Sequence, residues 1–244
     1  MRVAVLSDIH GNADALAAVL VDVRTASPDA IVNLGDCFSG PLDVARTADL
    51  LASAGITATV RGNHDRTLFE PDNMDDWDRA AHPLLTQNTL DWLASLPATA
   101  TLGDAFLCHA TPQDDLTYWL EATQRGGPII RAPLADIVAR AMGIPQTLML
   151  CGHTHVPRAL HLPDGRLIVN PGSVGCPGFA DPTPPIPHIM CTGTPHASYA
   201  ILDQHGPQWH VTHRLIPYDT VPATALARQR GFDAWAQVLA TGWL

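Results

Sequence analysis

The sequence Val3-Ala4-Val5-Leu6-Ser7-Asp8-Ile9-His10-Gly11-Asn12 joins an apolar run to a polar turn near the start of the chain. The run over residues 3–6 is short and free of charges, which is typical of a buried strand. Residues 12–24 then carry apolar side chains at a helical spacing, at Leu16, Val19, Leu20 and Val23. A strand that leads through a short turn into a helix is the first half of a β-α-β unit, so this stretch predicts an α/β fold.

Two further apolar runs continue the same alternation. Residues 31–34 and 56–60 are predicted strands, and residues 43–54 between them have a helical pattern that Gly55 ends. The order strand, helix, strand, helix, strand implies a parallel sheet with helices packed on it.

The later part of the chain has a mixed pattern. Residues 72–79 are polar and acidic, and we expect a surface loop or cap there. Residues 175–195 contain six prolines, which exclude a helix or a central strand, so we expect a long rigid loop. The other predicted elements are a helix over 86–96, a hairpin of 98–101 with 105–108, a helix over 134–141, a strand over 147–151, a hairpin of 159–162 with 167–169, an antiparallel pair of 198–202 with 209–215, and one helix over 223–239.

Composition limits the class of protein. The 244 residues have a formal charge of −10, which argues against a basic surface for duplex nucleic acid. No apolar run reaches the length of about 18 residues that spans a membrane, and the N-terminus lacks a signal-peptide pattern. We therefore expect one soluble, cytoplasmic domain over residues 1–244, with no membrane partner. The five cysteines lack CxxC spacing and are expected to be free thiols, and Cys37, Cys108 and Cys151 should point into the core.

Predicted strands end in side chains that can bind metal ions. These strand-end residues are Asp8, His10, Asp36, Asn63, His109, His153 and His155. Asp8 and His10 are two positions apart, as are His153 and His155, and in extended backbone such pairs point to the same side. Because the carboxyl ends of parallel strands meet at one edge of a sheet, we expect all seven side chains to converge. Nitrogen and oxygen donors without a thiolate suit Mn, Fe, Zn, Co or Ni better than Mg or Ca.

Five blocks together resemble the calcineurin-like metallophosphoesterase superfamily. They are Asp8-Ile9-His10-Gly11-Asn12, Gly35-Asp36, Gly62-Asn63-His64-Asp65, His109, and Gly152-His153-Thr154-His155. Asn170-Pro171-Gly172-Ser173-Val174-Gly175 and Ala197-Ser198-Tyr199-Ala200 resemble its small bacterial phosphodiesterase branch, which shares features with diadenosine tetraphosphatase-like proteins. The resemblance implies a four-layer α/β sandwich of two facing mixed β-sheets flanked by helices, with metals at one edge.

The resemblance also implies a role for each candidate ligand. One divalent ion would be held by Asp8, His10 and His155, and a second by Asn63, His109 and His153, with Asp36 bridging them. Mn is the expected metal, with Fe, Zn, Ni and Co as alternatives. The implied enzyme is a metal-dependent phosphoesterase that hydrolyses phosphodiesters, with phosphomonoesters as further substrates, through a hydroxide that bridges the two metals.

His64 binds no metal in this implied arrangement. We expect it to donate a proton to the leaving oxygen, the alternative being that it only binds substrate. Asp65 is expected to orient the His64 imidazole through a hydrogen bond, or else to cap the following turn. Small-branch relatives often carry another residue at the position of His64, so its presence favours monoesterase activity beside diesterase activity.

Candidate substrate contacts lie outside the ligand set. Arg61 is expected to contact substrate or to form a surface ion pair, and Arg158 has the same two alternatives. Residues 176–195 form an insertion relative to the small branch, and we expect either a wall or lid of the substrate pocket or a cover for a sheet edge. His188 and His196 would bind phosphate or have no ligand.

Several functions stay open at this point. The expected partner is a small phosphate ester, with nucleotides among the candidates. One alternative is a hydrolase of dinucleoside polyphosphates or cyclic nucleotides, and a second is a metal-binding scaffold without turnover. The scaffold would be expected to lack a ligand or His64, and neither is missing. A two-metal amide hydrolase would not explain Gly62-Asn63-His64-Asp65. The substrate, the physiological metal and the oligomeric state are not predicted.

Overall fold

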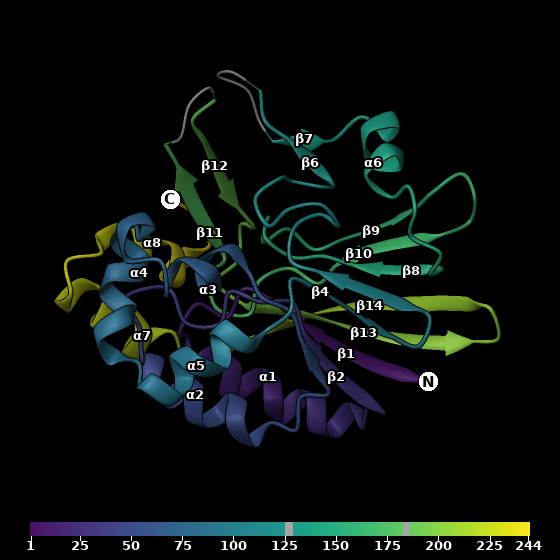
Figure 1. Cartoon of the computed structure of the whole chain (residues 1–244). Helices are drawn as coiled ribbons and strands as arrows, with labels where there is room; N and C mark the ends of the chain where they lie inside the picture. Colours follow the sequence, from purple (N-terminus) through teal and green to yellow (C-terminus); the bar gives the residue numbers. More distant parts are fainter. Residues whose placement is uncertain (125–128, 183–185) are drawn as a thin grey trace.

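The computed structural model describes residues 1–124, 129–182 and 186–244. Two five-stranded mixed β-sheets face each other, and helices flank them on the outer sides (Figure 1). The predicted α/β sandwich of two facing mixed sheets flanked by helices is confirmed.

The first sheet has the strand order β14-β13-β1-β2-β3. Its strands are β1 (Arg2–Leu6), β2 (Ala30–Asn33), β3 (Ala58–Thr59), β13 (Ala197–His205) and β14 (Gln208–Ile216). β1, β2 and β3 run parallel, and β13 pairs antiparallel with both β1 and β14. The predicted β-α-β-α-β order and the predicted antiparallel pair are therefore both present.

The second sheet has the order β4-β5-β8-β10-β9. Its strands are β4 (Thr99–Leu102), β5 (Ala105–Cys108), β8 (Leu148–Leu150), β9 (Arg158–His161) and β10 (Leu167–Asn170). β5, β8 and β10 run parallel, and β4 and β9 close antiparallel hairpins. The parallel strands of the two sheets end at a shared edge, where Asp8 Oδ1 after β1 lies 4.0 Å from His109 Nε2 after β5.

Helices α1 (Ala13–Ala26) and α2 (Val44–Ser53) cover the outer face of the first sheet, below it in Figure 1. Both begin at side-chain caps, because the side chains of Asn12 and Asp43 accept hydrogen bonds from backbone N–H groups of the first turn. The other helical elements are α3 (Asn63–Thr67), η1 (Pro71–Asn73), α4 (Asp76–Ala81), η2 (His82–Leu84), α5 (Gln87–Ser95), α6 (Leu134–Arg140), α7 (Val221–Gln229) and α8 (Asp233–Thr241).

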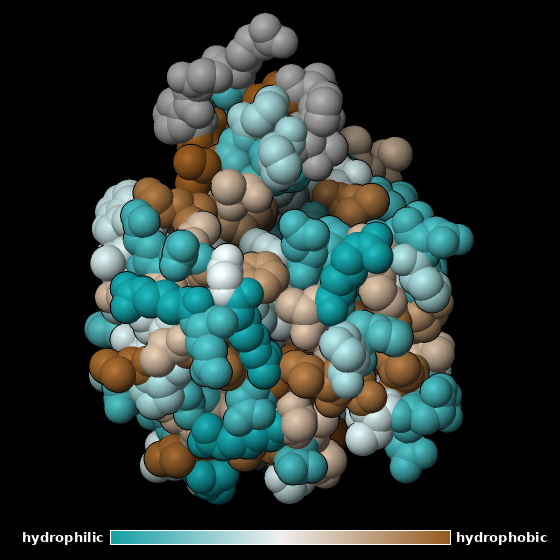
Figure 2. Space-filling model, turned by 90° about the vertical axis from the view of Figure 1, so that its left-hand side faces the viewer, coloured by the Kyte–Doolittle hydropathy of each residue, from teal (hydrophilic) through white to brown (hydrophobic). Residues whose placement is uncertain are grey.

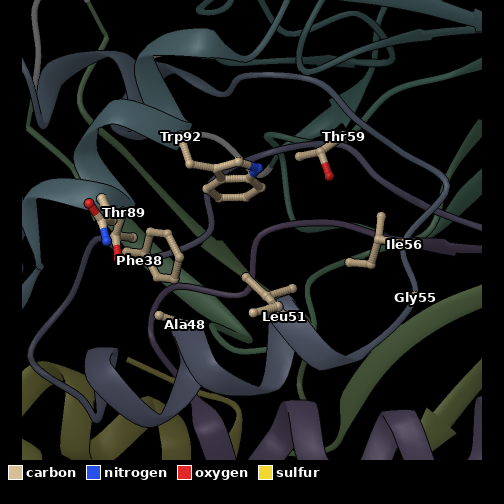
Figure 3. Close-up of a pocket in the computed structure, with 10 residues that line it drawn as sticks. Phe38, Ala48, Leu51, Gly55, Ile56, Thr59, Thr89 and Trp92 are labelled. Carbon is tan, nitrogen blue, oxygen red and sulfur yellow. The ribbon is translucent and has the colours of Figure 1, made fainter.

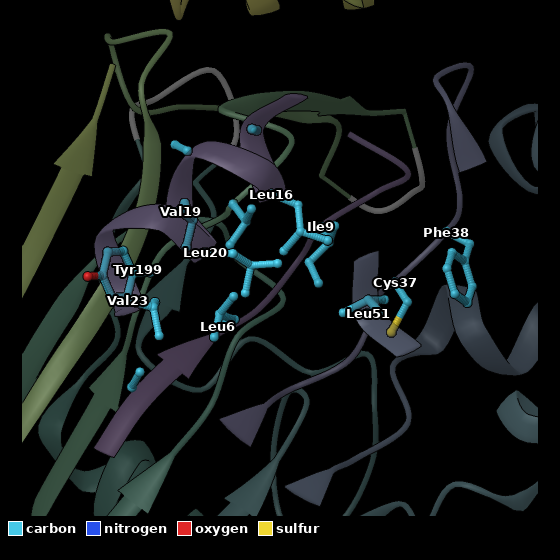
Figure 4. Close-up of a cluster of buried hydrophobic side chains, with 14 of the residues drawn as sticks. Leu6, Ile9, Leu16, Val19, Leu20, Val23, Cys37, Phe38, Leu51 and Tyr199 are labelled. Atoms are coloured by element: carbon cyan, nitrogen blue, oxygen red, sulfur yellow. The ribbon is translucent and has the colours of Figure 1, made fainter. Parts of the chain in front are cut away.

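Alternation along β1 divides the hydrophobic core into layers. Val3 and Val5 belong to a buried cluster between the two sheets that also contains Leu107. Leu6 belongs to the outer cluster with Leu16 of α1, and Figure 4 shows the two side chains in that cluster. A strand buried on both faces has little freedom to shift, so β1 is a rigid support for the residues that follow it.

We had predicted a surface loop or cap for the acidic segment over residues 72–79, but much of this segment is helical. It contains most of η1 and the start of α4, whose N-cap is Asp75. The Asp75 carboxylate accepts hydrogen bonds from the backbone N–H groups of Trp77 and Asp78. Carboxylates stabilise the first turn of a helix, so this acidic composition belongs to a helix N-terminus.

The predicted single helix over residues 223–239 is also wrong. The chain instead forms α7 and α8, separated at Gly231, whose φ of 84° is left-handed and ends α7.

Over the described residues, no helix is both long and apolar enough to cross a membrane.

Residues 175–195 do not form one long loop. They contain a hairpin of β11 (Gly178–Asp181) and β12 (His188–Cys191), in which Phe179 lies opposite Met190. Pro177, Pro182 and Pro187 lie just outside the paired segments, which is why a two-stranded hairpin tolerates this composition. The prediction at residues 183–185 falls outside the described residues. A second unpredicted hairpin, β6 (Glu121–Ala122) with β7 (Ile130–Arg131), rises beside β11 and β12 in Figure 1.

Candidate metal centre

Two groups of side chains, all buried except the half-buried His153, meet at the shared edge of the sheets. Asp8, His10 and His155 form the first group, and Asp36, His109 and His153 form the second. Within each group the potential ligand atoms lie within 4.8 Å of one another. The structure therefore brings together residues that lie up to 147 positions apart (155 − 8), and the grouping coincides with the division that the resemblance implies.

Asp36 lies between the two groups. Its Oδ2 atom is 3.2 Å from His109 Nε2 in its own group and 3.8 Å from His10 Nε2 in the other group. Asn63 completes the second group, because its Oδ1 atom is 3.0 Å from His109 Nε2. Asp36 Oδ1 accepts the backbone N–H of His64 at 3.0 Å, so Oδ2 is the oxygen that faces both groups and is suited to contact two cations at once.

The backbone at the candidate ligands is unusual. In the described part of the chain six non-glycine residues have positive φ, and five of them are Asp8, His10, Asp36, His153 and His155, with φ between 49° and 67°. Left-handed backbone at such residues costs about 1–2 kcal/mol each. We had predicted extended backbone at the two i, i+2 pairs, and this is wrong. In the left-handed conformation His153 and His155 reach different groups.

Hydrogen bonds between loops hold this strained backbone in place. The N–H groups of Asp8 and His10 donate to the carbonyl oxygens of Gly35 and Asp36, at 3.0 and 2.9 Å. The loop after β1 is thus tied to the loop after β2, beyond the ends of both strands. The N–H of Gly175 donates to the carbonyl of Asp8 at 3.0 Å from the other side. Strain at a functional site persists only when the surroundings determine it in this way.

Each imidazole is oriented through the nitrogen that faces away from the centre. The Nδ1 atoms of His10, His109 and His155 lie 2.7–3.0 Å from the backbone carbonyl oxygens of Ser39, Leu34 and Cys176. A carbonyl only accepts, so Nδ1 carries a proton and Nε2 faces the centre, where the neutral ring presents a lone pair. His153 is reversed, because its Nε2 donates to the carbonyl of Leu116 at 2.9 Å. Its Nδ1 atom is therefore the one that carries a lone pair and could bind a metal ion.

The buried carboxylates dominate the electrostatics of the cluster. Burial raises the pKa of Asp36, but the charges of His109 and His64 lower it by a larger amount, so that this pKa lies well below its usual value. Burial lowers the pKa of His109, yet the Asp36 carboxylate raises it to about 9. Burial and a neighbouring histidine lower the pKa of His10 to about 3 and that of His153 to about 4. The buried carboxylates are therefore stabilised by positive charge beside them, but two of the four imidazoles, those of His10 and His153, stay neutral because their pKa values are lowered.

These residues fit divalent cations. Asp8 Oδ1 is buried and accepts no hydrogen bond within the described residues, and His155 Nε2 lies 3.4 Å from it, although a buried carboxylate oxygen without a hydrogen bond is costly. His10 Nε2 and His155 Nε2 lie 3.2 Å apart, and if both nitrogens carry lone pairs this contact is repulsive. A cation between these atoms would satisfy all three. The donor set of imidazole nitrogen, carboxylate oxygen and amide oxygen, without thiolate, matches the metals expected from the sequence.

His64 lies beside the ligands but outside both groups. Its Nδ1 donates to Asp78 Oδ1 at 2.9 Å, and its ring stacks on Trp77 with centroids 5.6 Å apart. The expected hydrogen bond from His64 to Asp65 is wrong. The Asp65 carboxylate instead accepts from the N–H groups of Asp36, Cys37 and Gly62 at 2.8, 2.8 and 3.0 Å. Asp65 therefore caps α3 and holds the Asp36 loop, which is the alternative role.

A cavity of about 840 Å³ opens over the two groups. It is lined by His10, Asp36, Asn63, His64, His153 and His155, together with residues of α4, β11 and β12. Phe179, Asp181 and His188 of the 176–195 segment contribute to its wall, which favours the wall or lid over the cover for a sheet edge. His188 Nε2 is 2.9 Å from the Tyr118 hydroxyl, and both side chains line the cavity.

The other candidate substrate contacts lie elsewhere. Arg61 is not among the described lining residues, and its guanidinium lies 5.5 Å from the ring centre of Phe69. His196 lines a separate cavity of about 230 Å³ beside Cys191. Arg158 forms an ion pair with Glu121 at 2.6 Å. Of the four candidate substrate contacts, only His188 therefore lies among the described residues that line the cavity over the metal groups.

A third cavity, of about 450 Å³, lies between α2 and α5 and contains none of the candidate ligands. Phe38 and Trp92 contribute aromatic walls, and Figure 3 shows them with Leu51 and Ile56 around the space. Phe38 is two residues beyond Asp36 in the chain, but its side chain lines this cavity. Cys37, beside it in sequence, is buried in the core as predicted, and so are Cys108 and Cys151.

The aromatic walls of the main cavity were not predicted. Trp77 lies in a segment interpreted as a loop, and Phe179 lies in the proline-rich segment. Tyr118 lines the cavity, whereas its neighbour in sequence, Trp119, is fully buried. These residues come from three separate elements, and their sequence has no periodic signal that would have identified them.

Comparison with known proteins identifies the family of the chain. A family model described as the calcineurin-like phosphoesterase superfamily domain matches residues 1–203. The chain belongs to this superfamily.

Three relatives show how far the similarity extends. The chain is 24% identical over 223 residues to an uncharacterised protein of Methanocaldococcus jannaschii, covering 83% of this chain and 82% of that one. Its structure is similar to a metallophosphoesterase from Sphaerobacter thermophilus, with a TM-score of 0.77, 26% identity and 99% of each chain covered. A putative diadenosine tetraphosphatase has a TM-score of 0.51 and 17% identity, covering 87% of this chain and 93% of that one, so it shares the fold alone.

Proposed function

We propose that the chain is a phosphoric ester hydrolase that uses two divalent metal ions, Mn foremost, to cleave small phosphodiesters and phosphomonoesters. The observation that carries this proposal is the position of Asp36, whose Oδ2 lies 3.2 Å from His109 Nε2 and 3.8 Å from His10 Nε2. One carboxylate thereby joins two sets of nitrogen and oxygen donors at the base of an open cavity. Superfamily membership supports the same reaction class.

The bound metal ions and His64 would have separate roles in the reaction. Bound divalent ions would polarise the phosphoryl oxygens and lower the pKa of a water molecule. His64 lines the cavity, and its Nδ1 is held by Asp78, which leaves Nε2 for the substrate. In the hydrolysis the oxygen of water adds to phosphorus, the bond from phosphorus to the leaving oxygen breaks, and His64 gives that oxygen a proton, which the proton lost by the water replaces. General-acid help of this kind contributes about 10²–10⁴ in rate.

The alternatives have weaker support. A non-catalytic scaffold does not explain why His64 is oriented toward the cavity and every candidate ligand is present. A dinucleoside polyphosphate or cyclic-nucleotide hydrolase differs only in its substrate, so a substrate screen distinguishes it.

The test is a substrate screen. The protein is stripped with a chelator, reloaded with Mn²⁺, and assayed against phosphomonoesters, phosphodiesters, cyclic nucleotides and dinucleoside polyphosphates. We expect hydrolysis that disappears in the Asp36→Asn variant and persists in His161→Ala, which removes an exposed histidine on β9. Failure to cleave any of these esters would overturn the proposal.

A further inference from the structure

The imidazole of His64 lies at one end of a series of aromatic rings. The rings of His64 and Trp77 are nearly parallel, with an angle of 16° between them and centroids 5.6 Å apart. The Trp235 ring meets the Trp77 ring at 73°, with centroids 4.8 Å apart. Offset stacks and edge-to-face contacts are the two favoured arrangements of aromatic rings. Trp77 therefore links His64 to Trp235.

Trp235 is held firmly by the elements around it. It is 4% exposed on α8 and belongs to a buried cluster with Leu42 and Leu239, against which Trp77 also packs. Gly40 makes room for the indole, because a Cβ atom at that position would lie 2.9 Å from Trp235 Cη2. A side chain enclosed in this way has little freedom to change its rotamer.

Trp77 has less support from its own helix. It is half-buried on α4, a helix of six residues, and it lines the main cavity. Figure 2 shows the face that carries α4, where hydrophilic residues cover much of the surface. Segments with few buried apolar contacts open at a lower cost in free energy than core elements do. The cluster around Trp235 therefore supplies apolar support that keeps the Trp77 ring against His64.

The hydrogen bond to Asp78 leaves the plane of the His64 ring some freedom. Asp78 Oδ1 lies 2.9 Å from His64 Nδ1, but hydrogen bonds tolerate bending by about 30°. The last side-chain torsion of histidine also has only a broad preference. A parallel ring against one face of the imidazole removes this freedom. Proton transfer depends on such orientation, because small misplacements of a reacting group are costly in rate.

We propose that Trp235 is a positioning residue for proton transfer, which acts through Trp77 to hold the His64 ring in the plane that aims Nε2 at the leaving oxygen. This inference rests on the proposed function and adds to it a residue outside the ligand set. Trp235 is not among the described residues that line the cavity, so its effect on a substrate passes through its neighbours. It also lies beyond residues 1–203, the segment that the family model matches.

A second route from Trp235 to the site would run through a metal ligand. The centroid of the His10 ring lies 6.1 Å from that of Trp235. The His10 ring has a restraint of its own, because its Nδ1 donates to the Ser39 carbonyl at 3.0 Å and the residue is fully buried. We therefore expect metal binding to survive the loss of Trp235.

Steady-state kinetics on two types of ester test the role of Trp235. Trp235→Leu should lower kcat about tenfold on alkyl esters, whose leaving oxygen needs a proton, and less than about twofold on p-nitrophenyl esters. KM should stay unchanged, because the contribution of His64 is made in the transition state. Trp235→Phe keeps a ring in the cluster and should restore most of the rate on alkyl esters. Trp235→Leu should cause no further loss when His64→Gln is already present.

Val23→Ala is the control for a general loss of stability. Val23 is 1% exposed near the end of α1, where the Ala26 carbonyl accepts from Arg2 at the start of β1, away from the metal groups. Its truncation should lower the free energy of unfolding and leave the ratio of alkyl to aryl rates unchanged. Trp235→Met, with a flexible side chain that fills gaps, replaces Trp235→Leu if circular dichroism shows that the leucine variant does not fold.

Two kinetic results would overturn the inference. One is an equal loss of kcat on both types of ester. The other is a loss of bound metal in Trp235→Leu that accounts for the loss of rate, since the effect would then run through His10. Elemental analysis of the purified variant measures its metal content, which we expect to equal that of wild type.

The position of the His64 ring is also measured without turnover, by NMR of the protein loaded with diamagnetic Zn²⁺. The His64 signals are identified by their absence in His64→Gln, and Trp77→Leu gives the shift caused by loss of the stacked ring. Trp235→Leu should move the His64 signals in the same direction, and Val23→Ala should leave them in place. His64 signals that keep their wild-type positions in Trp235→Leu overturn the inference.

The NMR comparison separates this inference from the proposed function. If no ester of the substrate screen is cleaved, the proposed function fails, and the shift of the His64 signals alone decides whether Trp235 holds the His64 ring. If esters are cleaved and Trp235→Leu changes neither the ratio of rates nor the His64 signals, the phosphoesterase proposal stands and the role of Trp235 is overturned.

Discussion

Asp78 holds His64 in place, with Asp78 Oδ1 lying 2.9 Å from His64 Nδ1 while the second carboxylate oxygen accepts from the Thr67 hydroxyl at 2.6 Å. Asp78 is 1% exposed and touches no candidate ligand in these contacts. It is a positioning residue, because its effect on a substrate would pass through the tautomer and orientation of His64.

We therefore expect Asp78→Asn to lower kcat by about tenfold to a hundredfold on esters with poor leaving groups, since part of the general-acid contribution is lost. Esters with p-nitrophenol as leaving group need little protonation and should be affected much less. Adding Asp78→Asn to His64→Gln should cause no further loss, because the effect requires the imidazole. Steady-state kinetics on alkyl and aryl esters measure this. Equal losses on both ester types would contradict the assignment.

The two ligand groups should lose metal separately. His10 and His109 belong to different groups, so we expect His10→Ala and His109→Ala each to lower the bound metal by about one equivalent after dialysis. Asp36→Asn should weaken both sites. Elemental analysis of the purified proteins measures the metal content, and His161→Ala is the control that should retain the full amount. Equal loss of both equivalents in each histidine variant would show that the sites are not separable in this way.

Asp65 should matter for stability more than for proton transfer. Its carboxylate is fully buried and accepts three backbone N–H groups, from Asp36, Cys37 and Gly62. Asp65→Ala leaves these donors without partners, and we expect a loss of about 2–4 kcal/mol in the free energy of unfolding. Urea denaturation of the metal-free protein measures this, with Asp72→Asn as a surface control expected within about 0.5 kcal/mol of wild type. A loss no larger than that of the control would contradict the capping role.

Asp22 should make stability depend on pH. Burial raises the pKa of this α1 carboxyl. Hydrogen bonds from the Tyr199 hydroxyl at 2.5 Å and the Arg214 guanidinium at 2.6 Å lower the pKa by a larger amount, so that it lies below its usual 3.8. A pKa depressed on folding adds stability above the unfolded pKa, and this stability is lost as the pH falls through the folded pKa. Asp22→Asn should therefore be less stable than wild type at neutral pH.

That difference should shrink in acid. We expect the gap in unfolding free energy between wild type and Asp22→Asn to be about 1 kcal/mol at neutral pH and to narrow below about pH 4. Denaturation curves at both pH values, with Asp49→Asn on the surface of α2 as control, check this. A gap that stays constant into acid would show that the interactions do not depend on the carboxylate charge.

Local patterns predicted more of the fold than of the cavity. The apolar runs that became β1, β2 and β8 are short and bounded by polar turns, and such signals do not depend on distant residues. The acidic segment that contains α4 was misinterpreted because a helix N-cap and a polar loop use the same residues. The 176–195 segment was misinterpreted because prolines outside a hairpin and prolines inside a loop differ only in position.

The sequence by itself determined the alternation of strands and helices and the identity of the candidate ligands, because apolar periodicity and the polar residues after each strand are local features. The family resemblance implied which ligands share a group, but only the tertiary structure gives the physical reason, because the left-handed backbone at His153 and His155 sends neighbouring side chains in different directions. It also decided that Asp78 rather than Asp65 holds His64, and that Phe179 and Trp77 face the same cavity. These relationships depend on how separate elements pack against one another, and no local pattern in the chain encodes them.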